Sequence, residues 1–106
     1  MYVRMTFFKL KQGKMQELRD LYNKEVISAH KKDKGNRFVH LLESLDNKDE
    51  GISVTAWDTK ADVEAYEKSG EYEKLVIKFK NMYAGEPVLK SYEVTASSEP
   101  IILRIF

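Results

Sequence analysis

The sequence predicts an α+β domain of the ferredoxin-like class, in which a four-stranded antiparallel sheet carries two helices on one face. Two observations lead to this prediction. Stretches that alternate between apolar and polar residues are interleaved with stretches of helical period, in the order β-α-β-β-α-β. A short polar segment, 46–51, joins the two middle strands as a hairpin turn. The length of 106 residues corresponds to a single domain.

The first half of the chain predicts one strand and one long helix. The strand covers 2–10, and its two faces carry Val3, Met5 and Phe7 on one side and Arg4, Thr6 and Phe8 on the other. From 14 to 33 the apolar residues recur three or four positions apart, which is the period of an amphipathic helix. The members of this apolar stripe are Met15, Leu18, Tyr22, Val26 and Ala29.

The two middle strands and the start of the second helix follow. Strands are predicted over 37–45 and 52–57, and the second of these ends on the only tryptophan of the chain, Trp57. Thr59 and Asp62 have the spacing of a capping box, in which the side chain of the first residue bonds the backbone N–H three positions later. A second helix is therefore predicted to begin after Thr59.

The last third of the chain predicts an interrupted helix, a strand and a tail. The sequence KSGEY at 68–72 is expected to interrupt the second helix, with Ser69 capping the part that follows. The last strand is predicted over 88–95. Residues 97–106 are expected to form an added C-terminal strand or tail, because IILRIF is too apolar to stay free and would cover a sheet edge or clamp a partner subunit.

Composition narrows the classes of function. The chain has 18 basic and 17 acidic residues, so its net charge of +1 does not favour nucleic acid as a partner. It has no cysteine, which excludes disulfides, thiolate metal sites and cysteine nucleophiles. With only two histidines, no metal and no cofactor are expected. No apolar run reaches the ~18 residues of a membrane helix, so we expect a cytoplasmic protein without a membrane partner.

The open face of the predicted sheet raises a packing problem. Since both helices cover one face, the other face is expected to carry Phe8, Phe38 and Trp57, with Leu42 beside them. An apolar patch of that size marks an interface or a ligand site. The sequence therefore predicts a homodimer that forms through the open sheet face.

With these elements in place, the chain resembles the antibiotic biosynthesis monooxygenase (ABM) domain family of the dimeric α/β-barrel superfamily. The segments that carry the resemblance are YVRMTFFKLKQGKMQEL, NRFVHLLESLDN and VTAWDTKADVEAYEKSGEY, and it extends from residue 1 to about 95. It implies a dimeric α/β barrel. Some members of the family oxidise aromatic polyketides or quinols with molecular oxygen and no cofactor, others degrade haem, and others have no known activity.

The resemblance argues against haem degradation. The haem-degrading branch uses an asparagine on the first strand, a tryptophan on the second helix and a histidine further along that helix. The corresponding positions here are Thr6, Tyr66 and Val76, and all three differ. Valine has no atom that ligates iron.

Aromatic residues near the end of the third strand are candidates for a substrate site. Trp57 is expected on the face away from the helices, where it would stack on a planar substrate or pack in a dimer core. Tyr66 and Tyr72 would donate hydrogen bonds to a developing anion, or simply pack on the sheet. Phe8 and Phe38 are further candidates for the wall of the substrate site.

Three polar residues complete the candidate site. His40 is the candidate general base, because histidine titrates nearest to neutral pH, although an exposed strand histidine without a function is common. Arg4 and Thr6 are expected on the same face as Trp57. Arg4 would stabilise an anionic intermediate or form a structural ion pair, and Thr6 would contact the substrate.

Two functions remain open at this point, and a third is disfavoured. The first is a cofactor-independent monooxygenase or oxidoreductase of small aromatic compounds of the quinol or polyketide type. The second is a non-catalytic dimeric barrel that binds a small molecule or regulates. RNA binding shares the order of elements, but the third strand, GISVTAW, has neither basic residues nor alternating aromatic residues.

Overall fold

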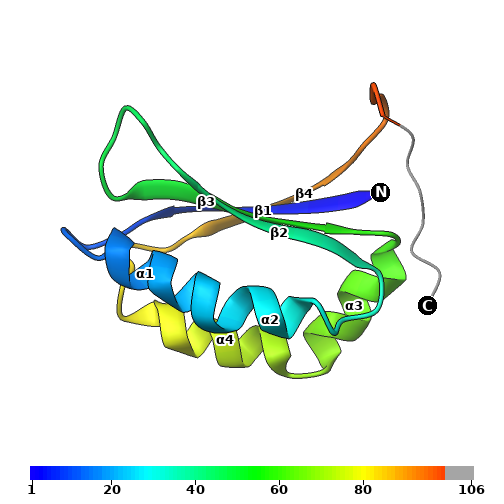
Figure 1. Cartoon of the computed structure of the whole chain (residues 1–106), viewed down its shortest axis with the longest axis horizontal. Coiled ribbons are helices and arrows are strands. Elements are labelled where there is room, and N and C mark those ends of the chain that lie inside the picture. Colours follow the sequence, from blue (N-terminus) through cyan, green and yellow to red (C-terminus); the bar gives the residue numbers. More distant parts are fainter. Residues whose placement is uncertain (100–106) are drawn as a thin grey trace.

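The computed structural model describes residues 1–99 and has the predicted α+β architecture (Figure 1). The sheet has four antiparallel strands in the order β2-β3-β1-β4. Their bounds are β1 Tyr2–Lys9, β2 Asn36–Glu43, β3 Glu50–Trp57 and β4 Val88–Glu93. Of the tail predicted over 97–106, residues 97–99 are not in a strand and residues 100–106 lie outside the described residues. Among residues 1–99, no helix is long and apolar enough to cross a membrane.

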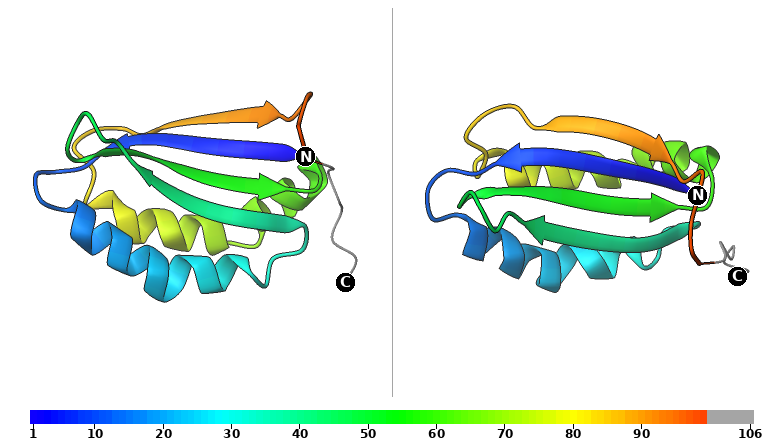
Figure 2. Two further views of the ribbon diagram at one scale, coloured as in Figure 1. Left: turned by 45° about the horizontal axis from the view of Figure 1, so that its top comes forward. Right: turned by 90° about the horizontal axis from the view of Figure 1, so that it is seen from above.

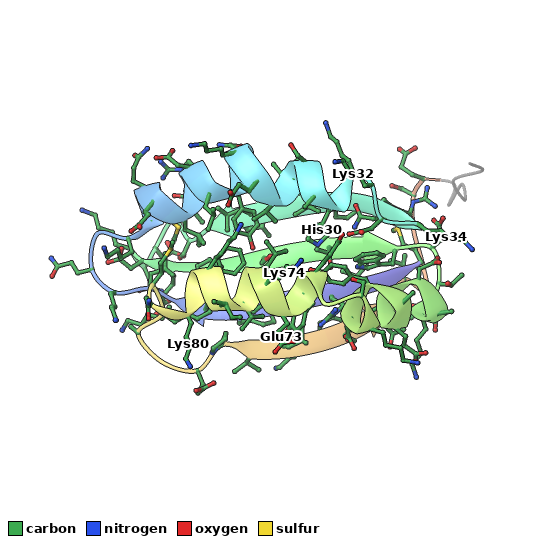
Figure 3. The ribbon with its side chains drawn as sticks, turned by 90° about the horizontal axis from the view of Figure 1, so that it is seen from below. His30, Lys32, Lys34, Glu73, Lys74 and Lys80 are labelled. Atoms are coloured by element: carbon green, nitrogen blue, oxygen red, sulfur yellow. The ribbon has the colours of Figure 1, made fainter. Side chains whose placement is uncertain are left out.

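All helices lie on one face of the sheet, which leaves a two-layer molecule (Figures 1 and 2). The first helix is continuous and consists of α1 Met15–Leu21, η1 Tyr22–Val26 and α2 Ile27–His30. Its partner is formed by α3 Lys60–Lys68 and α4 Glu71–Lys80. Seen from the helical side, the first helix and α4 run side by side, and β4 lies beyond the outer edge of α4 (Figure 3).

The local signals that begin and interrupt the second helix are confirmed. The Thr59 hydroxyl accepts the Asp62 backbone N–H at 3.2 Å, so α3 begins with the predicted cap. The helix breaks between α3 and α4 at Gly70, whose φ of 87° lies in the left-handed region that glycine tolerates best. The prediction that Ser69 caps α4 is wrong, because the N-cap is Gly70 and no side chain caps this helix; the Ser69 hydroxyl still accepts the Glu71 N–H at 3.2 Å.

A π-helical turn interrupts the first helix at Tyr22–Val26. The Ile27 N–H bonds to the Tyr22 carbonyl, five residues back, which adds one residue to this turn. With this extra residue, side chains four positions apart share one face of the helix. Leu18, Tyr22, Val26 and His30 are accordingly all buried. The predicted stripe followed an uninterrupted helix and therefore ended on Ala29 instead of His30.

The two faces of the sheet carry different residues from those predicted. The prediction that Trp57 lies on the face away from the helices is wrong, and so is the prediction for Phe8, Arg4 and Thr6. Trp57 packs with Val63 and Tyr66 of α3, and Phe8 packs in the main core between sheet and helices. The alternation along β1 and β3 is as predicted, but the face that turns to the helices is the opposite one.

The open face is formed by the more apolar set of strand residues. Its buried centre is Val3, Val54 and Ala56, against which other apolar residues of the strands pack. Phe38, His40 and Leu42 of β2 pair with Ala56, Val54 and Ile52 and therefore lie on this face, as predicted. The helix-facing side contains the polar residues because it encloses a cavity, which is described next.

Candidate functional site

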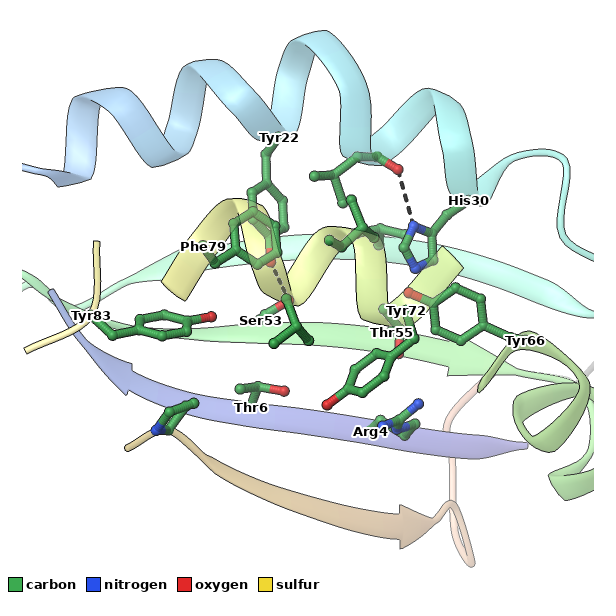
Figure 4. Close-up of a pocket in the computed structure, with 15 residues that line it drawn as sticks. Arg4, Thr6, Tyr22, His30, Ser53, Thr55, Tyr66, Tyr72, Phe79 and Tyr83 are labelled. Carbon is green, nitrogen blue, oxygen red and sulfur yellow. Dashed lines mark hydrogen bonds between the residues drawn. The ribbon is translucent and has the colours of Figure 1, made fainter. Parts of the chain in front are cut away.

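A cavity lies between the sheet and the helical layer (Figure 4). Its volume is about 120 Å³. Every layer of the fold contributes to its wall, and most of the lining side chains are aromatic or aliphatic. The residues that line it are Arg4, Thr6, Tyr22, Val26, His30, Val39, Ser53, Thr55, Tyr66, Tyr72, Leu75, Val76, Phe79, Tyr83 and Pro87.

The sheet supplies a polar floor to the cavity. Arg4 pairs with Thr55 across β1 and β3, and Thr6 pairs with Ser53, so these four side chains form a small polar group on the helix-facing side. Two of the hydroxyls hold aromatic side chains in place. The Tyr22 hydroxyl bonds to Ser53 Oγ at 2.6 Å. Trp57 Nε1 donates to Thr55 Oγ1 at 3.0 Å.

His30 reaches the cavity from the end of the first helix and is 3% exposed. Its Nδ1 lies 3.0 Å from the Val26 carbonyl, and because a carbonyl only accepts, Nδ1 carries the proton. In the neutral ring, Nε2 is then an acceptor. Burial lowers the pKa of His30 below its usual value, and the bond to Val26 only partly opposes this shift. The side chain is therefore a neutral base at neutral pH.

Three aromatic rings surround His30 at the same end of the cavity. The Tyr66 ring centroid lies 4.9 Å from that of His30 and 5.0 Å from that of Trp57. Tyr72 meets Tyr66 edge-on at 6.0 Å. Burial raises the pKa of Tyr66, and nearby Asp33 adds to this shift, so the phenol stays protonated and acts as a hydrogen-bond donor.

Arg4 is the charged group of this site, and its side chain is only 5% exposed. Its Nη1 lies 3.0 Å from Oε1 of Glu67, which is itself 45% exposed. The guanidinium also lies 5.0 Å from the centre of the Tyr72 ring, so it makes a cation–π contact there. Among the residues that line the cavity, all of them within the described part of the chain, Arg4 is the one with a permanent charge.

A pair of carboxyl groups flanks the His30 end of the cavity. Asp33 follows α2, and Glu71 begins α4. Each has one carboxyl oxygen that is shielded from water and lacks a hydrogen-bond donor among the described residues. Burial raises the pKa of Asp33 to about 7, and hydrogen bonding to Glu71 and its charge contribute. Two carboxyl groups bond to each other only when one is protonated, so Asp33 keeps a proton into the neutral range.

The structure brings some of the predicted site residues together and separates others. Arg4, Thr6, Tyr66 and Tyr72 all line the cavity. Trp57 lies behind Tyr66, and Phe8 lies deeper in the core beside Tyr83; neither lines the cavity.

Phe38 and His40 are on the open face, where their rings meet edge-on at 4.4 Å. The role of His40 as a base stays a prediction. His40 is not among the residues that line this cavity.

His30 is the residue that sequence reasoning missed. A regular helical period places Ala29 on the inner face and turns His30 partly outward. The π-turn shifts the phase by one residue and brings His30 in. A signal was present, since Leu18, Tyr22, Val26 and His30 are spaced by four throughout, which exceeds the 3.6 residues of an α-helical turn.

The fold and its cavity define the class: a ferredoxin-like α+β domain that encloses a site between sheet and helices. The family model for antibiotic biosynthesis monooxygenases matches residues 1–77, and the chain belongs to this family. No curated protein matches the chain.

Solved structures with this fold extend over nearly the whole chain. A protein from Nitrosomonas europaea assigned as an antibiotic biosynthesis monooxygenase has a TM-score of 0.77 and 18% identity, covering 91% of this chain and 100% of that chain. One from Deinococcus radiodurans with the same assignment has a TM-score of 0.79 and 13% identity, covering 95% and 99%. The heme-degrader MhuD from Mycobacterium tuberculosis, solved with two hemes in its active site, has a TM-score of 0.72 and 15% identity, covering 93% and 100%.

With its walls as they stand, the cavity is too small to enclose haem. Its volume of about 120 Å³ lies below the ~300–1,000 Å³ of pockets that hold drug-sized ligands. Thr6, Tyr66 and Val76 line the cavity at the positions that correspond to the asparagine, tryptophan and histidine of the haem-degrading branch, and none of the three is a histidine. Among the described residues that line the cavity, His30 on the first helix carries the one imidazole. Residues 1–99 contain no group of three or more histidine, cysteine, aspartate or glutamate side chains that could hold a bare metal ion.

Proposed function

We propose that the protein is a cofactor-independent monooxygenase of small, electron-rich aromatic compounds. The observation that carries the proposal is the neutral His30 with its acceptor Nε2, placed in a buried aromatic cavity. Membership of the antibiotic biosynthesis monooxygenase family supports it. A base in a cavity shielded from water can take the proton of a phenol and keep the resulting anion from being quenched.

The chemistry would take place mainly in the substrate. His30 removes a phenolic proton, and the hydroxyl of Tyr66 or Tyr72 donates a hydrogen bond to the anion. The electron-rich ring then reduces O₂. For a hydroquinone, a ring C–H becomes a C–O bond and the ring becomes a hydroxyquinone. One atom of O₂ enters the product and the other leaves as water, so the substrate supplies all four electrons.

The test is oxygen uptake by metal-free protein with a panel of hydroquinones and anthrone-like phenols. His30→Gln is expected to lower the rate about 10²- to 10⁴-fold, which is the usual contribution of a general base. The matched control is His40→Gln, which changes the other histidine on the opposite, open face and should leave the rate within about twofold. Because burial lowers the pKa of His30, the wild-type rate should rise with pH and reach its plateau below the usual range of histidine.

The opposite pattern would contradict the assignment. Loss of uptake in His40→Gln, with normal uptake in His30→Gln, would place the base on the open face. Absence of uptake with the whole panel, together with retained binding of the phenols, would favour a non-catalytic binding domain.

We further propose that a second copy of the chain covers the open sheet face. Apolar side chains remain largely exposed there: Leu42 is 45% exposed, Val88 51% and Tyr92 45%, and they border the buried centre of the face. Lys90 and His40 also lie on this face, but most of it is apolar, and an apolar surface of this kind is rarely left to water. Two copies of one surface can pair symmetrically.

Sedimentation velocity tests this interface. The wild type is expected to sediment as a dimer, and Leu42→Lys is expected to shift it to a monomer, because each copy would bury an unpaired charge in the interface. Ile77→Lys is the control, since Ile77 is 65% exposed on the outer side of α4. A monomeric wild type, or a Leu42→Lys variant that remains dimeric, would exclude the proposed interface.

A further inference from the structure

The Arg4 end of the cavity has more hydrogen-bonding capacity than the protein uses. A guanidinium carries five N–H donors. Among the described residues, the polar partner of Arg4 is one oxygen of Glu67, and the Tyr72 ring covers one face of the group. None of the Arg4 nitrogens is among the described side-chain atoms that are shielded from water and lack a partner, so the donors that Glu67 leaves unused are open to a ligand. Thr6, two residues along the same face of β1, adds a hydroxyl with no partner among residues 1–99.

The charge distribution points to an anion. Arg4 is the permanently charged residue of the lining, and no aspartate or glutamate belongs to the lining within the described chain. The nearby carboxyl groups lie outside the lining: Glu67 is paired with Arg4 and is half exposed, and Asp33 and Glu71 flank the His30 end. Arginine matches the planar geometry of a carboxylate and can bind both of its oxygens. The Tyr72 ring fixes the guanidinium from one side, as Figure 4 shows, so its orientation is set before a ligand binds.

The remainder of the cavity selects a single aromatic ring. Beyond Arg4 the wall is formed by Val26, Leu75, Phe79 and the tyrosines, with the Tyr22 and Phe79 rings stacked at 5.5 Å. The cavity volume of about 120 Å³ is close to that of a cavity of ~150 Å³ that binds benzene. Two fused rings exceed this volume, so the second ring would have to lie in the mouth of the cavity or displace the wall.

We infer that the ligand of this protein is a single-ring aromatic acid whose carboxylate binds Arg4. The inference rests on the proposed function, since it names the substrate class of the same cavity: a hydroquinone that also carries a carboxylate. Its carboxylate would bind at the Arg4–Thr6 end, and its ring would lie among the aromatic side chains.

The experiment is anaerobic calorimetric titration with three compounds. 2,5-Dihydroxybenzoate has the proposed chemistry, 2,5-dihydroxybenzamide removes the charge, and 1,4-dihydroxy-2-naphthoate adds a second ring. We expect the benzoate to bind at least about tenfold more tightly than either of the others, because a hydrogen bond to a charged group contributes about 1.5–3 kcal/mol. Equal or tighter binding of the amide or the naphthoate, or no binding of the benzoate, overturns the inference.

Two variants locate the carboxylate. Arg4→Gln should weaken benzoate binding about 10- to 100-fold and leave amide binding within about threefold. Because a change at a buried arginine can impair folding, Glu67→Gln provides an independent test at a half-exposed position. It removes the charge that partly neutralises Arg4, so benzoate binding should strengthen about threefold. A Glu67→Gln variant that binds the benzoate no better than wild type contradicts the contact.

Oxygen uptake separates the two proposals. Selective binding of the benzoate without oxygen uptake retains the ligand class and rejects the monooxygenase. Uptake that occurs with uncharged hydroquinones, while the benzoate fails to bind, retains the monooxygenase and rejects the ligand class.

Discussion

Trp57→Ala is expected to lower the free energy of unfolding by about 3–5 kcal/mol, the usual cost of removing a large buried aromatic side chain. Trp57 is fully buried at the end of β3, and its ring packs against Val63 and Tyr66 of α3. The substitution would leave a cavity and remove the donor to Thr55. Chemical denaturation followed by circular dichroism measures the effect, since the variant has no tryptophan left to report by fluorescence.

Two further variants show whether the loss comes from this packing. Trp57→Phe keeps a ring in the site and should lose clearly less than Trp57→Ala. Leu45→Ala removes a fully exposed side chain on the β2–β3 turn and should stay within about 0.5 kcal/mol of wild type. If Trp57→Ala cost less than about 1 kcal/mol, the contact between β3 and α3 would not be part of the cooperative core.

Asp33→Asn is expected to stabilise the protein above pH 7 by about 1–2 kcal/mol, with little effect near pH 4. The pKa of Asp33 is raised from 3.8 to about 7 in the folded chain, first by burial and then by Glu71. Between these two values the folded chain holds a proton that the unfolded chain has released. Stability due to this group therefore falls as the pH rises from about 4 to 7.

Urea denaturation at pH 4.5, 6 and 8 checks this prediction. The difference in unfolding free energy between Asp33→Asn and wild type should grow with pH. Asp46→Asn is the matched control, because it makes the same chemical change on the exposed β2–β3 turn. A constant difference across the three pH values would show that the Asp33–Glu71 pair does not share a proton.

The order of the elements could be predicted because each one has its own local signal. The Thr59 cap, the break at Gly70 and the polar turn between the middle strands act through residues close in sequence. Such signals do not depend on how the elements pack against each other. The structure accordingly matches these predictions within one or two residues.

The orientation of the sheet could not be predicted from alternation alone. Both sides of β1 and β3 carry apolar residues, so the pattern fixes which residues share a face and leaves open which face meets the helices. The rule that the more apolar side packs on the helices fails here. Arg4, Thr6, Ser53 and Thr55 turn to the helices because they line a cavity, and the more apolar set faces outward.

Some residues of the candidate site could nonetheless be predicted from the sequence. Tyr66 and Tyr72 follow from their position on the interrupted helix. Strand parity correctly places Arg4 and Thr6 on one face together, but the face that was predicted for them was the wrong one. His30 did not follow, because its position depends on a hydrogen bond that spans five residues instead of four. Such a turn has a weak sequence signature and is stabilised by tertiary contacts.

The π-helical turn at Tyr22–Val26 determines which way the side chain of His30 points, because it sets the rotation of the following residues about the helix axis. In an α-helix each residue turns the chain by about 100°. If residues 22–26 adopted regular α-helical hydrogen bonds, the segment after them would rotate by about that angle. Ala29 would then occupy the wall of the cavity in place of His30. One backbone hydrogen-bond register thus decides whether the cavity contains a base, with no residue exchanged and no element unfolded.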